Sequence, residues 1–512
     1  MEIIDNKALL LKVRQPNKIT EVIPKSKSLS SNEVLVNWGL EEAQVLKNLK
    51  IKNVPSPICR NYKWTGKYKP FEHQKTTSGF LTLNKRAFCF NEQGTGKTAS
   101  AIWAADFLMK QGRIKRALVI CPLSIMDSAW REDLFSFAMH RKVDIAHGSA
   151  KKRTAVIEGD AEFVIINYDG VAIVSDAIAN GGFDLVIVDE ATHYKNAQTD
   201  RWKTLNRLLG PDKWLWMMTG TPAAQSPLDA YGLAKLVNPK AVPRFFGSFR
   251  DQTMVKVTNF KWVPKPNATE TVFKALQPAI RFTKEECLDL PDIVYTNRDV
   301  PLTRQQEKYY KELKNRMIIE AAEETVTAAT AAVNMNKLLQ ISSGAVYTDD
   351  NAVVEFDIKH RYKVLREVID ESSKKVLIFV PFKHTIQLLA DKLLKDKIPT
   401  EIISGAVKAS DRTRIFKEFQ ETDSPRVLVI QPQAAAHGVT LTAANTIVWW
   451  GPTSSVETYA QANARIHRAG QDHKCTVVQL RGSHIEKRVY ALLDNKIDTH
   501  TKIIDLYQEI LD

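Results

Sequence analysis

Short apolar runs alternate with amphipathic stretches over about residues 67–237 and again over about residues 374–480. The runs "AFCF" (87–90) and "LVIV" (185–188) have the length and composition of buried strands, whereas "ASAIWAADFLMK" (99–110) has the spacing of a helix. Strands that alternate with helices are typical of parallel sheets. The pattern therefore predicts an α/β chain with two such blocks.

The residues between the two blocks have a different character. An alanine-rich, glycine-poor run from Thr303 to about Leu339 predicts a long helix, and Thr303 and Gln306 are spaced as a capping box that opens it. Before this run, "VTNFKWVPKPNATE" (257–270) is polar and broken by proline. We expect a loop there, with Trp262 as an incidental exposed aromatic residue.

Residues 1–66 precede the first block. The stretches "ALLLKVRQP" and "KITEVIPK" predict a hairpin that turns at about Gln15 to Lys18, followed by the strand "EVLVNW" and a short helix. The basic residues of this segment could contact nucleic acid, or the segment could pack against the first block. Packing is the favoured interpretation.

Composition narrows the class of protein. A chain of 512 residues exceeds one hydrophobic core, and its longest apolar run, "ALVICPLSIM", is too short to span a membrane. The acidic start "MEIIDNK" and five cysteines without a CxxC pair argue against secretion and predict a cytoplasmic protein. The net charge of +14 fits a polyanionic partner, although it also fits an ordinary basic protein.

A glycine-rich turn lies between the first apolar run and its helix. In the order strand, turn, helix, the backbone of Gly94, Thr95 and Gly96 could cradle phosphates at a helix N-terminus. Lys97 would reach the phosphate oxygens, and the Thr98 hydroxyl would bind Mg²⁺. The alternative is a glycine turn that only caps a helix beside a solvated lysine.

Two adjacent carboxylates follow the second apolar run, in "FDLVIVDEATHYKN". Because α/β folds place chemistry where strands end, Asp189 would hold Mg²⁺ and Glu190 would orient and deprotonate water. Such pairs also arise by chance. The separation of 92 residues from Lys97 fits two or three intervening strand and helix units and strengthens the interpretation.

A third candidate lies in the second block, in "YAQANARIHRAGQ". Gln461, Arg465 and Arg468 recur at helical spacing and could share one face of a helix. A solvated basic helix is the commoner role of this pattern. An arginine so far along the chain could instead stabilise the γ-phosphate bound by the first block.

The order of these motifs resembles that of the Swi/Snf-type ATPases of helicase superfamily 2, over about residues 67–512. "KPFEHQ" resembles the adenine-reading Q motif, with Gln74, and "NEQGTGKT" resembles a motif I that also lacks the first glycine, so Asn91 fits. "DEATHYKN" resembles motif II, with Thr192 in place of the usual histidine. This departure affects the coupling between motif II and motif III more than it affects hydrolysis itself. Motif III is "MTGTPAAQSPLDAYGLAKLVNP", in which Thr219, Gly220 and Thr221 would link hydrolysis to DNA contacts.

The carboxy-terminal half continues the resemblance. "KVLIFVPFKHTIQLLADKL", "HGVTLTAANTIVWW" and "QANARIHRAGQ" resemble motifs IV, V and VI. The resemblance makes Arg468 an arginine finger, Arg465 its companion and Gln461 a nucleotide-state sensor. Where the family often has paired glycines and a tryptophan-asparagine-proline step, this chain has Ala435-Ala436 and Gly451–Thr453, so DNA contacts there can differ.

The resemblance also implies an architecture of two RecA-like parallel-sheet lobes with helical insertions. We expect a small N-terminal appendage (1–66), a first lobe (67–237), a linker with helical protrusions (238–373) and a second lobe (374–512). The helices of the linker would be protrusions on duplex DNA. They could instead be a spacer that only braces the two lobes.

The implied function is that of an ATP-dependent double-stranded DNA translocase. Its cofactors would be ATP and Mg²⁺, and its partner would be duplex or branched DNA. We expect a monomer without a membrane association, in the cytoplasm of a bacterium or of a virus-infected host cell; the sequence specifies no protein partner. The alternatives are a strand-separating DNA or RNA helicase and a catalytically silent nucleic-acid clamp, and the presence of Lys97, Asp189, Glu190 and Arg468 argues against the clamp.

Overall fold

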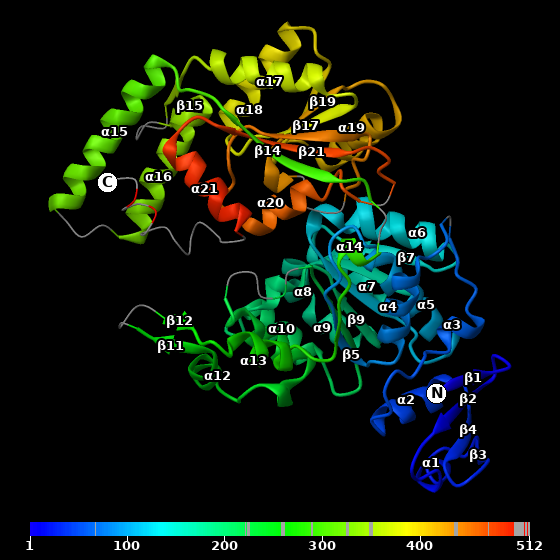
Figure 1. Ribbon diagram of the computed structural model, residues 1–512. Coiled ribbons are helices and arrows are strands. Elements are labelled where there is room, and N and C mark those ends of the chain that lie inside the picture. Colours follow the sequence, from blue (N-terminus) through cyan, green and yellow to red (C-terminus); the bar gives the residue numbers. More distant parts are fainter. Residues whose placement is uncertain are drawn as a thin grey trace. The chain divides into compact units, whose positions relative to one another are not determined.

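In the computed structural model the chain consists of two compact units, Met1–Cys287 and Leu288–Asp512 (Figure 1). The structure describes the following residues: 1–66, 68–220, 222, 226–257, 262–287, 290–323, 327–347, 352–434, 439–468, 470–495, 506 and 509.

A seven-stranded parallel sheet forms the centre of the first unit, in the order β13-β5-β10-β9-β6-β8-β7. The strands β5 and β9, which precede the glycine turn and the carboxylate pair, are therefore separated by β10 alone. The strands are β5 (Arg86–Cys89), β6 (Ala117–Cys121), β7 (Val143–Ala146), β8 (Phe163–Asn167), β9 (Leu185–Val188), β10 (Trp214–Met218) and β13 (Ala279–Ile280).

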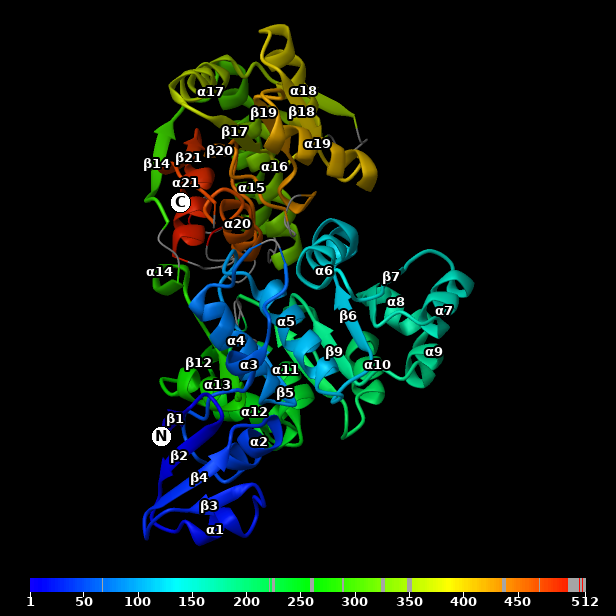
Figure 2. The same ribbon diagram turned by 90° about the vertical axis from the view of Figure 1, so that its right-hand side faces the viewer.

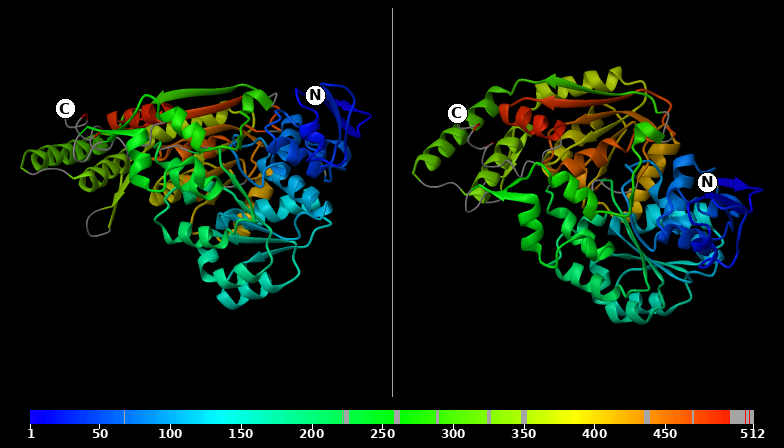
Figure 3. Two further views of the ribbon diagram at one scale, coloured as in Figure 1. Left: turned by 90° about the horizontal axis from the view of Figure 1, so that it is seen from below. Right: turned by 60° about the horizontal axis from the view of Figure 1, so that its bottom comes forward.

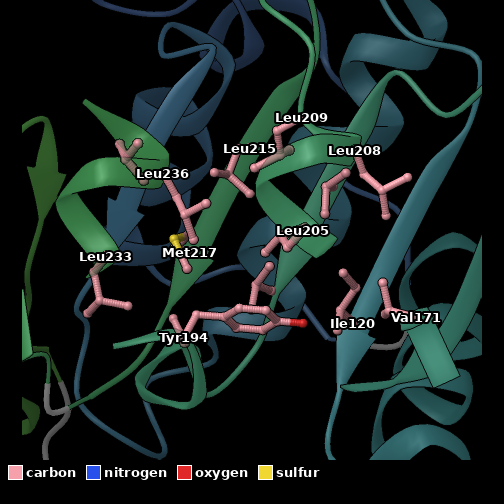
Figure 4. Close-up of a cluster of buried hydrophobic side chains, with 14 of the residues drawn as sticks. Ile120, Val171, Tyr194, Leu205, Leu208, Leu209, Leu215, Met217, Leu233 and Leu236 are labelled. Carbon is pink, nitrogen blue, oxygen red and sulfur yellow. The ribbon is translucent and has the colours of Figure 1, made fainter. Parts of the chain in front are cut away.

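Side chains that alternate along these strands build one core on each face of the sheet. Phe88 and Met217 belong to one core, whereas Cys89 and Met218 belong to the other. Figure 4 shows the first core, in which leucines of α10 meet Leu215 of β10. This face carries α7 (Ala150–Glu158), α8 (Tyr168–Ile173), α9 (Ser175–Asn180), α10 (Asp200–Leu208) and α11 (Asp229–Val237), and the opposite face carries α4 (Glu72–Thr82), α5 (Lys97–Lys110) and α6 (Glu132–Ala138) (Figure 2).

A buried carboxylate joins the segments around α5. Asp106 accepts hydrogen bonds from Tyr62 (2.6 Å), His140 (2.8 Å) and Arg141 (2.7 Å). Its side chain is fully buried and also pairs with Lys110 at 2.8 Å. Burial alone would raise the pKa of Asp106, but these hydrogen bonds outweigh it and lower the pKa to about 2.

The N-terminal residues form a separate antiparallel sheet in the order β1-β2-β4-β3 (Figure 3). The predicted hairpin at Gln15 to Lys18 is wrong, because helix α1 begins at Asn17, directly after Pro16, whose φ of −57° and ψ of −36° are helical. The predicted strand and short helix are confirmed as β4 and α2. The elements are β1 (Glu2–Ile4), β2 (Ala8–Lys12), α1 (Asn17–Thr20), β3 (Ser26–Ser28), β4 (Glu33–Asn37), α2 (Leu40–Asn48) and α3 (Ile58–Asn61).

Helix α2, which follows this small sheet, packs against the remainder of the first unit. Gln44 of α2 donates a hydrogen bond to the carbonyl oxygen of Thr82, at the end of α4, at 3.2 Å. Glu41, on the same helix, pairs with Arg113 at 2.5 Å. These contacts agree with the favoured interpretation that the segment packs against the first block.

The segment around Trp262 differs from the prediction of a loop. Strands β11 (Met254–Lys256) and β12 (Trp262–Pro264) form an antiparallel pair, and residues 258–261 between them lie outside the described part. Arg250 of α12 (Phe246–Thr253) lies over the Trp262 ring, 4.1 Å from its centroid. This cation–π contact gives Trp262 a structural partner. Helix α13 (Ala268–Ala275) follows, and α14 (Lys284–Cys287) ends the unit.

The second unit also has a parallel sheet at its centre, with six strands in the order β14-β21-β20-β17-β19-β18. Leu377 and Phe379 face one core, and Val376 and Ile378 face the other. The two parallel sheets confirm the predicted α/β class with two RecA-like lobes. The elements are β14 (Ile293–Asp299), α17 (Lys359–Glu371), β17 (Lys375–Phe379), α18 (Lys383–Lys395), β18 (Thr400–Ile403), α19 (Ala409–Glu421), β19 (Val427–Ile430), β20 (Ala444–Trp449), α20 (Val456–Asn463), β21 (Cys475–Arg481) and α21 (His484–Asp494).

The alanine-rich run forms two helices, α15 (Arg304–Glu323) and α16 (Ala328–Ser343), rather than one. The predicted capping box is confirmed, because the backbone N–H of Thr303 donates to Gln306 at 3.0 Å and the N–H of Gln306 donates to the Thr303 hydroxyl at 3.4 Å. Ser342 of α16 donates to Ser483 at the start of α21, which ties the helices to the second sheet. A small antiparallel pair follows, β15 (Ala345–Tyr347) and β16 (Val353–Glu355).

Within the described ranges, no helix combines the length and the apolar character that a membrane span requires.

The buried carboxylate near α5 generates a stability prediction. Asp106→Asn would remove the anionic partner of Lys110 and one of the two carboxylates that pair with Arg141, so we expect the free energy of unfolding to fall by roughly 3–5 kcal/mol. Asp160→Asn is the matched control, because Asp160 is exposed and pairs with the exposed Lys142. Chemical denaturation of the three proteins at pH 7 measures the difference.

The same carboxylate predicts the direction of the pH dependence. Because its pKa falls from 3.8 to about 2 on folding, its contribution is complete above about pH 4 and is lost as the pH falls towards about 2. The Asp106→Asn protein should lack this component of acid unfolding. Equal stability of the Asp106→Asn and Asp160→Asn proteins at pH 7 would contradict the structural role of Asp106.

Candidate nucleotide site

The glycine-rich turn connects β5 to the N-terminus of α5, as the sequence predicts. Gly94 and Gly96 have positive φ angles of 86° and 80°, which favour glycine. A Cβ atom at Gly96 would lie 2.0 Å from the Gln74 amide nitrogen, so the Gln74 side chain would have to move to admit a larger residue. Helix α5 begins at Lys97 without a side-chain cap on its first turn, which leaves a helix N-terminus suited to an anion.

Lys97 lies across this turn. Its ammonium group donates hydrogen bonds to the carbonyl oxygens of Asn91 at 2.8 Å and Glu92 at 3.2 Å. Phosphate oxygens are stronger acceptors than neutral carbonyls, so an incoming phosphate can replace these bonds. Thr98 is the second residue of α5 and is partly buried. The residues of the turn thus fit a nucleotide phosphate chain.

Gln74 binds the turn itself. Its amide nitrogen donates to the carbonyl oxygen of Thr95 at 3.2 Å, and its amide oxygen accepts from the backbone N–H of Phe71 at 3.0 Å. A ring nitrogen of His73 lies 2.8 Å from the same Thr95 oxygen. Gln74 therefore positions the phosphate turn in this structure, and its role in reading adenine stays a prediction.

The carboxylate pair follows β9 directly. Asp189 is buried, with 8% of its surface exposed, and accepts hydrogen bonds from the Trp130 indole at 2.9 Å and from the backbone N–H of Glu190 at 3.0 Å. Burial raises the pKa of Asp189, and the positive charge of Lys97 opposes this shift. Glu190 has a left-handed backbone with φ 46° and ψ 57°, a conformation that is rare outside glycine and is often found at functional sites.

The sheet brings Lys97 and Asp189 to the same edge. Cys89 of β5 is paired with Met218 of β10, and Val188 of β9 is paired with Met217, so the three parallel strands end together. Motif III begins at this edge, where the backbone N–H of Thr219 donates to the Cys89 carbonyl at 3.0 Å.

Gly220 follows Thr219, and Thr221 lies outside the described residues. Motifs I, II and III thus meet within the first unit, and the role of Thr221 stays a prediction.

The residue after Thr192 is a histidine with a clear partner. The ring centroids of His193 and Tyr168 lie 4.5 Å apart. Burial lowers the pKa of His193, and the positive charge of Arg201 lowers it further. The Tyr168 hydroxyl donates to the carbonyl oxygen of Asp189 at 2.7 Å. His193 therefore packs beside the strand that carries Asp189. The usual histidine of motif II would stand one position earlier, where this chain has Thr192.

The predicted helical face of motif VI is wrong. Helix α20 ends at Asn463, so Arg465 and Arg468 lie in the turns beyond it. The amide of Gln471 donates to several backbone carbonyls, including that of Ile466 at 3.0 Å, and these bonds stabilise a non-helical path. Both arginines nevertheless converge, because each donates to the carbonyl oxygen of Val439, at 3.1 Å for Arg465 and 3.3 Å for Arg468.

The other sequence-predicted positions of the second unit have mixed outcomes. Gln461 is buried and donates to Glu457 of the same helix at 3.1 Å. Ala435 and Ala436 lie outside the described residues. Arg465, Arg468 and Gln461 belong to one unit and Lys97 to the other, so the roles of these three residues towards the nucleotide stay predictions.

Two known domain families match the chain. The SNF2-related domain family matches residues 34–345, and the helicase conserved C-terminal domain family matches residues 360–470. The chain belongs to the SNF2-related family. Both matched domains are those of ATP-using, helicase-like enzymes, and the match confirms the resemblance to the Swi/Snf-type ATPases.

Relatives of this SNF2-related chain include bacterial and phage proteins. It is 27% identical over 421 residues to an uncharacterized ATP-dependent helicase of Mycoplasma genitalium, covering 79% of this chain and 39% of that protein. It is 24% identical over 428 residues to the putative protein p41 of Acyrthosiphon pisum secondary endosymbiont phage 1, covering 78% and 88%. The chain thus spans about two fifths of the Mycoplasma helicase and most of the phage protein.

A similar solved structure is the Sulfolobus solfataricus SWI2/SNF2 ATPase core in complex with dsDNA. The TM-score is 0.43 and the sequence identity is 20%, over 88% of this chain and 95% of that one.

Three residues near the SNF2-related motifs were not found by the sequence reasoning. Trp130, His73 and Tyr168 contact Asp189 or Thr95 directly. Trp130 lies in the π-helical turn Met126–Arg131, a feature that is often found near functional sites. A buried tryptophan requires a hydrogen-bond acceptor, but the sequence does not indicate which acceptor it finds.

Trp130 generates a prediction about metal use. Trp130→Phe removes the indole donor that holds Asp189 and should raise the Mg²⁺ concentration for half-maximal ATP hydrolysis by about 10-fold. Excess Mg²⁺ should restore most of the rate, because the ligand itself remains. Trp103→Phe is the matched control, since Trp103 is also buried but donates to Thr65. An unchanged Mg²⁺ dependence in Trp130→Phe would show that the indole does not position Asp189.

Proposed function

We propose that the protein is an ATP-dependent double-stranded DNA translocase. The observation that carries the proposal is the meeting of a phosphate turn and a buried carboxylate at one sheet edge, in a chain of the SNF2-related family. Bound Mg·ATP would supply the phosphoanhydride bond whose cleavage drives the motor.

The first unit would bind the nucleotide. The backbone N–H groups of Gly94, Thr95 and Gly96 would face the phosphates, and Lys97 would exchange its carbonyl partners for phosphate oxygens. Burial of this edge strengthens each of these interactions. Gln74 would read adenine while it supports the turn.

The two carboxylates would divide the chemistry between them. Asp189, together with Thr98, would hold Mg²⁺, because Trp130 and the Glu190 backbone fix its orientation. Glu190 would orient the attacking water and accept its proton. The left-handed backbone at Glu190 supports a catalytic role for this residue, since strained backbone of this kind clusters at active sites.

The second unit would complete the site. Arg468 would stabilise the charge that develops on the γ-phosphate, Arg465 would assist at the interface, and Gln461 would sense the nucleotide state. The shared carbonyl of Val439 supports a common location for the two arginines. Closure of the lobes on ATP would move the grip on DNA, and hydrolysis would reopen it.

Duplex or branched DNA is the proposed partner. The net charge of +14 and the helicase names of the relatives support a nucleic acid. Motifs that contact phosphates carry no base code, so binding should be independent of sequence and sensitive to salt. Contacts to six phosphates would give a log–log salt slope of about −5.

We propose the domain organisation that the sequence predicts. Residues 67–237 and 374–512 would make up most of the motor lobes, and 1–66 would be an appendage. The segment 238–373 would carry the protrusions, and it also contributes β13 to the first sheet and β14 to the second. The motor would act as a monomer in a bacterial or virus-infected cytoplasm.

A strand-separating helicase is the second candidate. The N-terminal hairpin at Pro16 could have been its wedge, but α1 occupies this position. This position therefore gives the strand-separating helicase no support. A silent clamp is less well supported, because a chain without hydrolysis has no need for Lys97, Glu190 and Arg468 together.

The ATPase rate tests the proposed function. We expect duplex DNA to stimulate hydrolysis more than single-stranded DNA or RNA does. Lys97→Ala should lose nucleotide affinity and turnover together, whereas Glu190→Gln should still bind Mg·ATP while turnover falls by about 10² or more. If Glu190→Gln hydrolyses ATP at the wild-type rate, Glu190 is not the water-activating residue; if RNA alone stimulates, DNA is not the partner.

Arg468 tests the contribution of the second unit. Because a finger acts on the transition state, Arg468→Ala should keep near-normal ATP affinity while turnover falls by about 10³-fold or more. Arg414→Ala is the control, since Arg414 is exposed and pairs with Glu418. A folded Arg468→Ala protein that hydrolyses ATP normally would make Arg468 an ordinary surface residue.

A further inference from the structure

A cleft of about 530 Å³ lies within the first unit, between the large parallel sheet and helix α2, which follows the small N-terminal sheet. Lys47 of α2, Lys85 of the segment before β5 and Arg113 of the segment after α5 line it. Asp212 and Trp214 close it at the start of β10. This volume lies within the usual range of small-molecule sites.

The cleft is separate from the nucleotide site. Lys85 and Trp214 lie at the amino ends of β5 and β10, whereas the phosphate turn and Asp189 follow the carboxyl ends of the same sheet. Arg113 lies beyond the C-terminus of α5, and Lys97 lies at its N-terminus. Helix α5 has 14 residues. It therefore separates the two places by roughly 20 Å.

Positive charge dominates the walls of the cleft. Lys85 pairs with Asp212 at 3.4 Å, and the Asp212 side chain is 97% exposed. Arg113 pairs with Glu41, whose side chain is 65% exposed. Exposed pairs of this kind contribute little stability, so both cations can exchange their partners for a more strongly charged anion.

Lys47 lies deepest among these cations. Its ammonium group donates to the Leu83 carbonyl at 3.2 Å and to the Asn84 side chain. Within the described ranges it has no acidic partner, and two of its three N–H donors have protein acceptors. Burial lowers the pKa of Lys47 to about 8. An anion in the cleft would favour its charged form and offset the loss of hydration.

We propose that this cleft binds a phosphate group between Lys47, Lys85 and Arg113. Arginine supplies a planar fork of N–H donors, and lysine supplies a compact positive charge. Both suit the oxygens of a phosphate group. The group could belong to a small phosphorylated molecule or to the backbone of DNA, since the recognised chemistry is the same. The proposal goes beyond the ATPase function and does not depend on hydrolysis.

Chemical labelling of lysine tests the proposal at the site itself. The full-length protein is acylated at pH 8 without ATP, and the labelling rate of each lysine is followed by peptide mass spectrometry. Bound phosphate would cover Lys47 and raise its pKa, so its rate should fall at least about fivefold in inorganic phosphate, in a short duplex without terminal phosphates, or in both. Lys52, which is exposed and outside the cleft, should keep its rate.

Two variants provide the controls. Arg113→Gln should abolish the protection of Lys47, whereas Arg131→Gln, at an exposed arginine outside the cleft, should retain it. Protection by inorganic phosphate alone assigns the site to small molecules, and protection by the duplex assigns it to the DNA backbone. Equal labelling of Lys47 with and without both probes, or equal protection of Lys52, would overturn the proposal.

Calorimetry gives a second measurement that does not require Lys47 to react. Inorganic phosphate is titrated into a Lys97→Ala protein, in which the nucleotide site is disabled. Binding that disappears in the Lys97→Ala, Arg113→Gln double variant supports the cleft. If Lys97→Ala gives no binding heat and Lys47 is not protected, the cleft is not a phosphate site, whatever the outcome of the DNA and ATPase experiments.

Discussion

The parallel pairing of β5, β10 and β9 is the constraint on which the candidate site depends. Because these strands run in register and end together, the phosphate turn, Thr219 and Asp189 lie at one edge, although they are far apart in sequence. The cores on both faces of the sheet hold that register. Lys97 and Asp189 influence each other electrostatically only because the strand order places them there.

Much of this arrangement could be predicted from the sequence. The run "LVIV" is β9 in full, and the glycine turn and α5 follow β5 as expected, because buried strands and phosphate turns leave strong local patterns. The hydrogen bond from Trp130 to Asp189 could not be predicted. It joins residues 59 positions apart, and its acceptor is decided by the tertiary structure.

The errors have physical causes of the same kind. Apolar spacing near Pro16 is compatible with a hairpin, but Pro16 has helical φ and ψ angles of −57° and −36°, and α1 follows it directly. Helical spacing continues past Asn463, but the Gln471 amide binds the Ile466 carbonyl, which a continued helix would need, and links this segment to the Ala444 carbonyl of β20. Local periodicity therefore identified the motifs, whereas long-range hydrogen bonds decided their backbone path. The convergence of Arg465 and Arg468 on Val439 results from that path.

Displacement of a third strand from triplex DNA tests the central claim most directly. A motor that follows one strand of an intact duplex should evict the third strand when ATP is present and leave the underlying duplex paired. The Glu190→Gln protein should bind the same DNA without evicting the strand. Efficient unwinding of tailed duplexes, together with failure to displace the third strand, would contradict translocation and favour a strand-separating helicase.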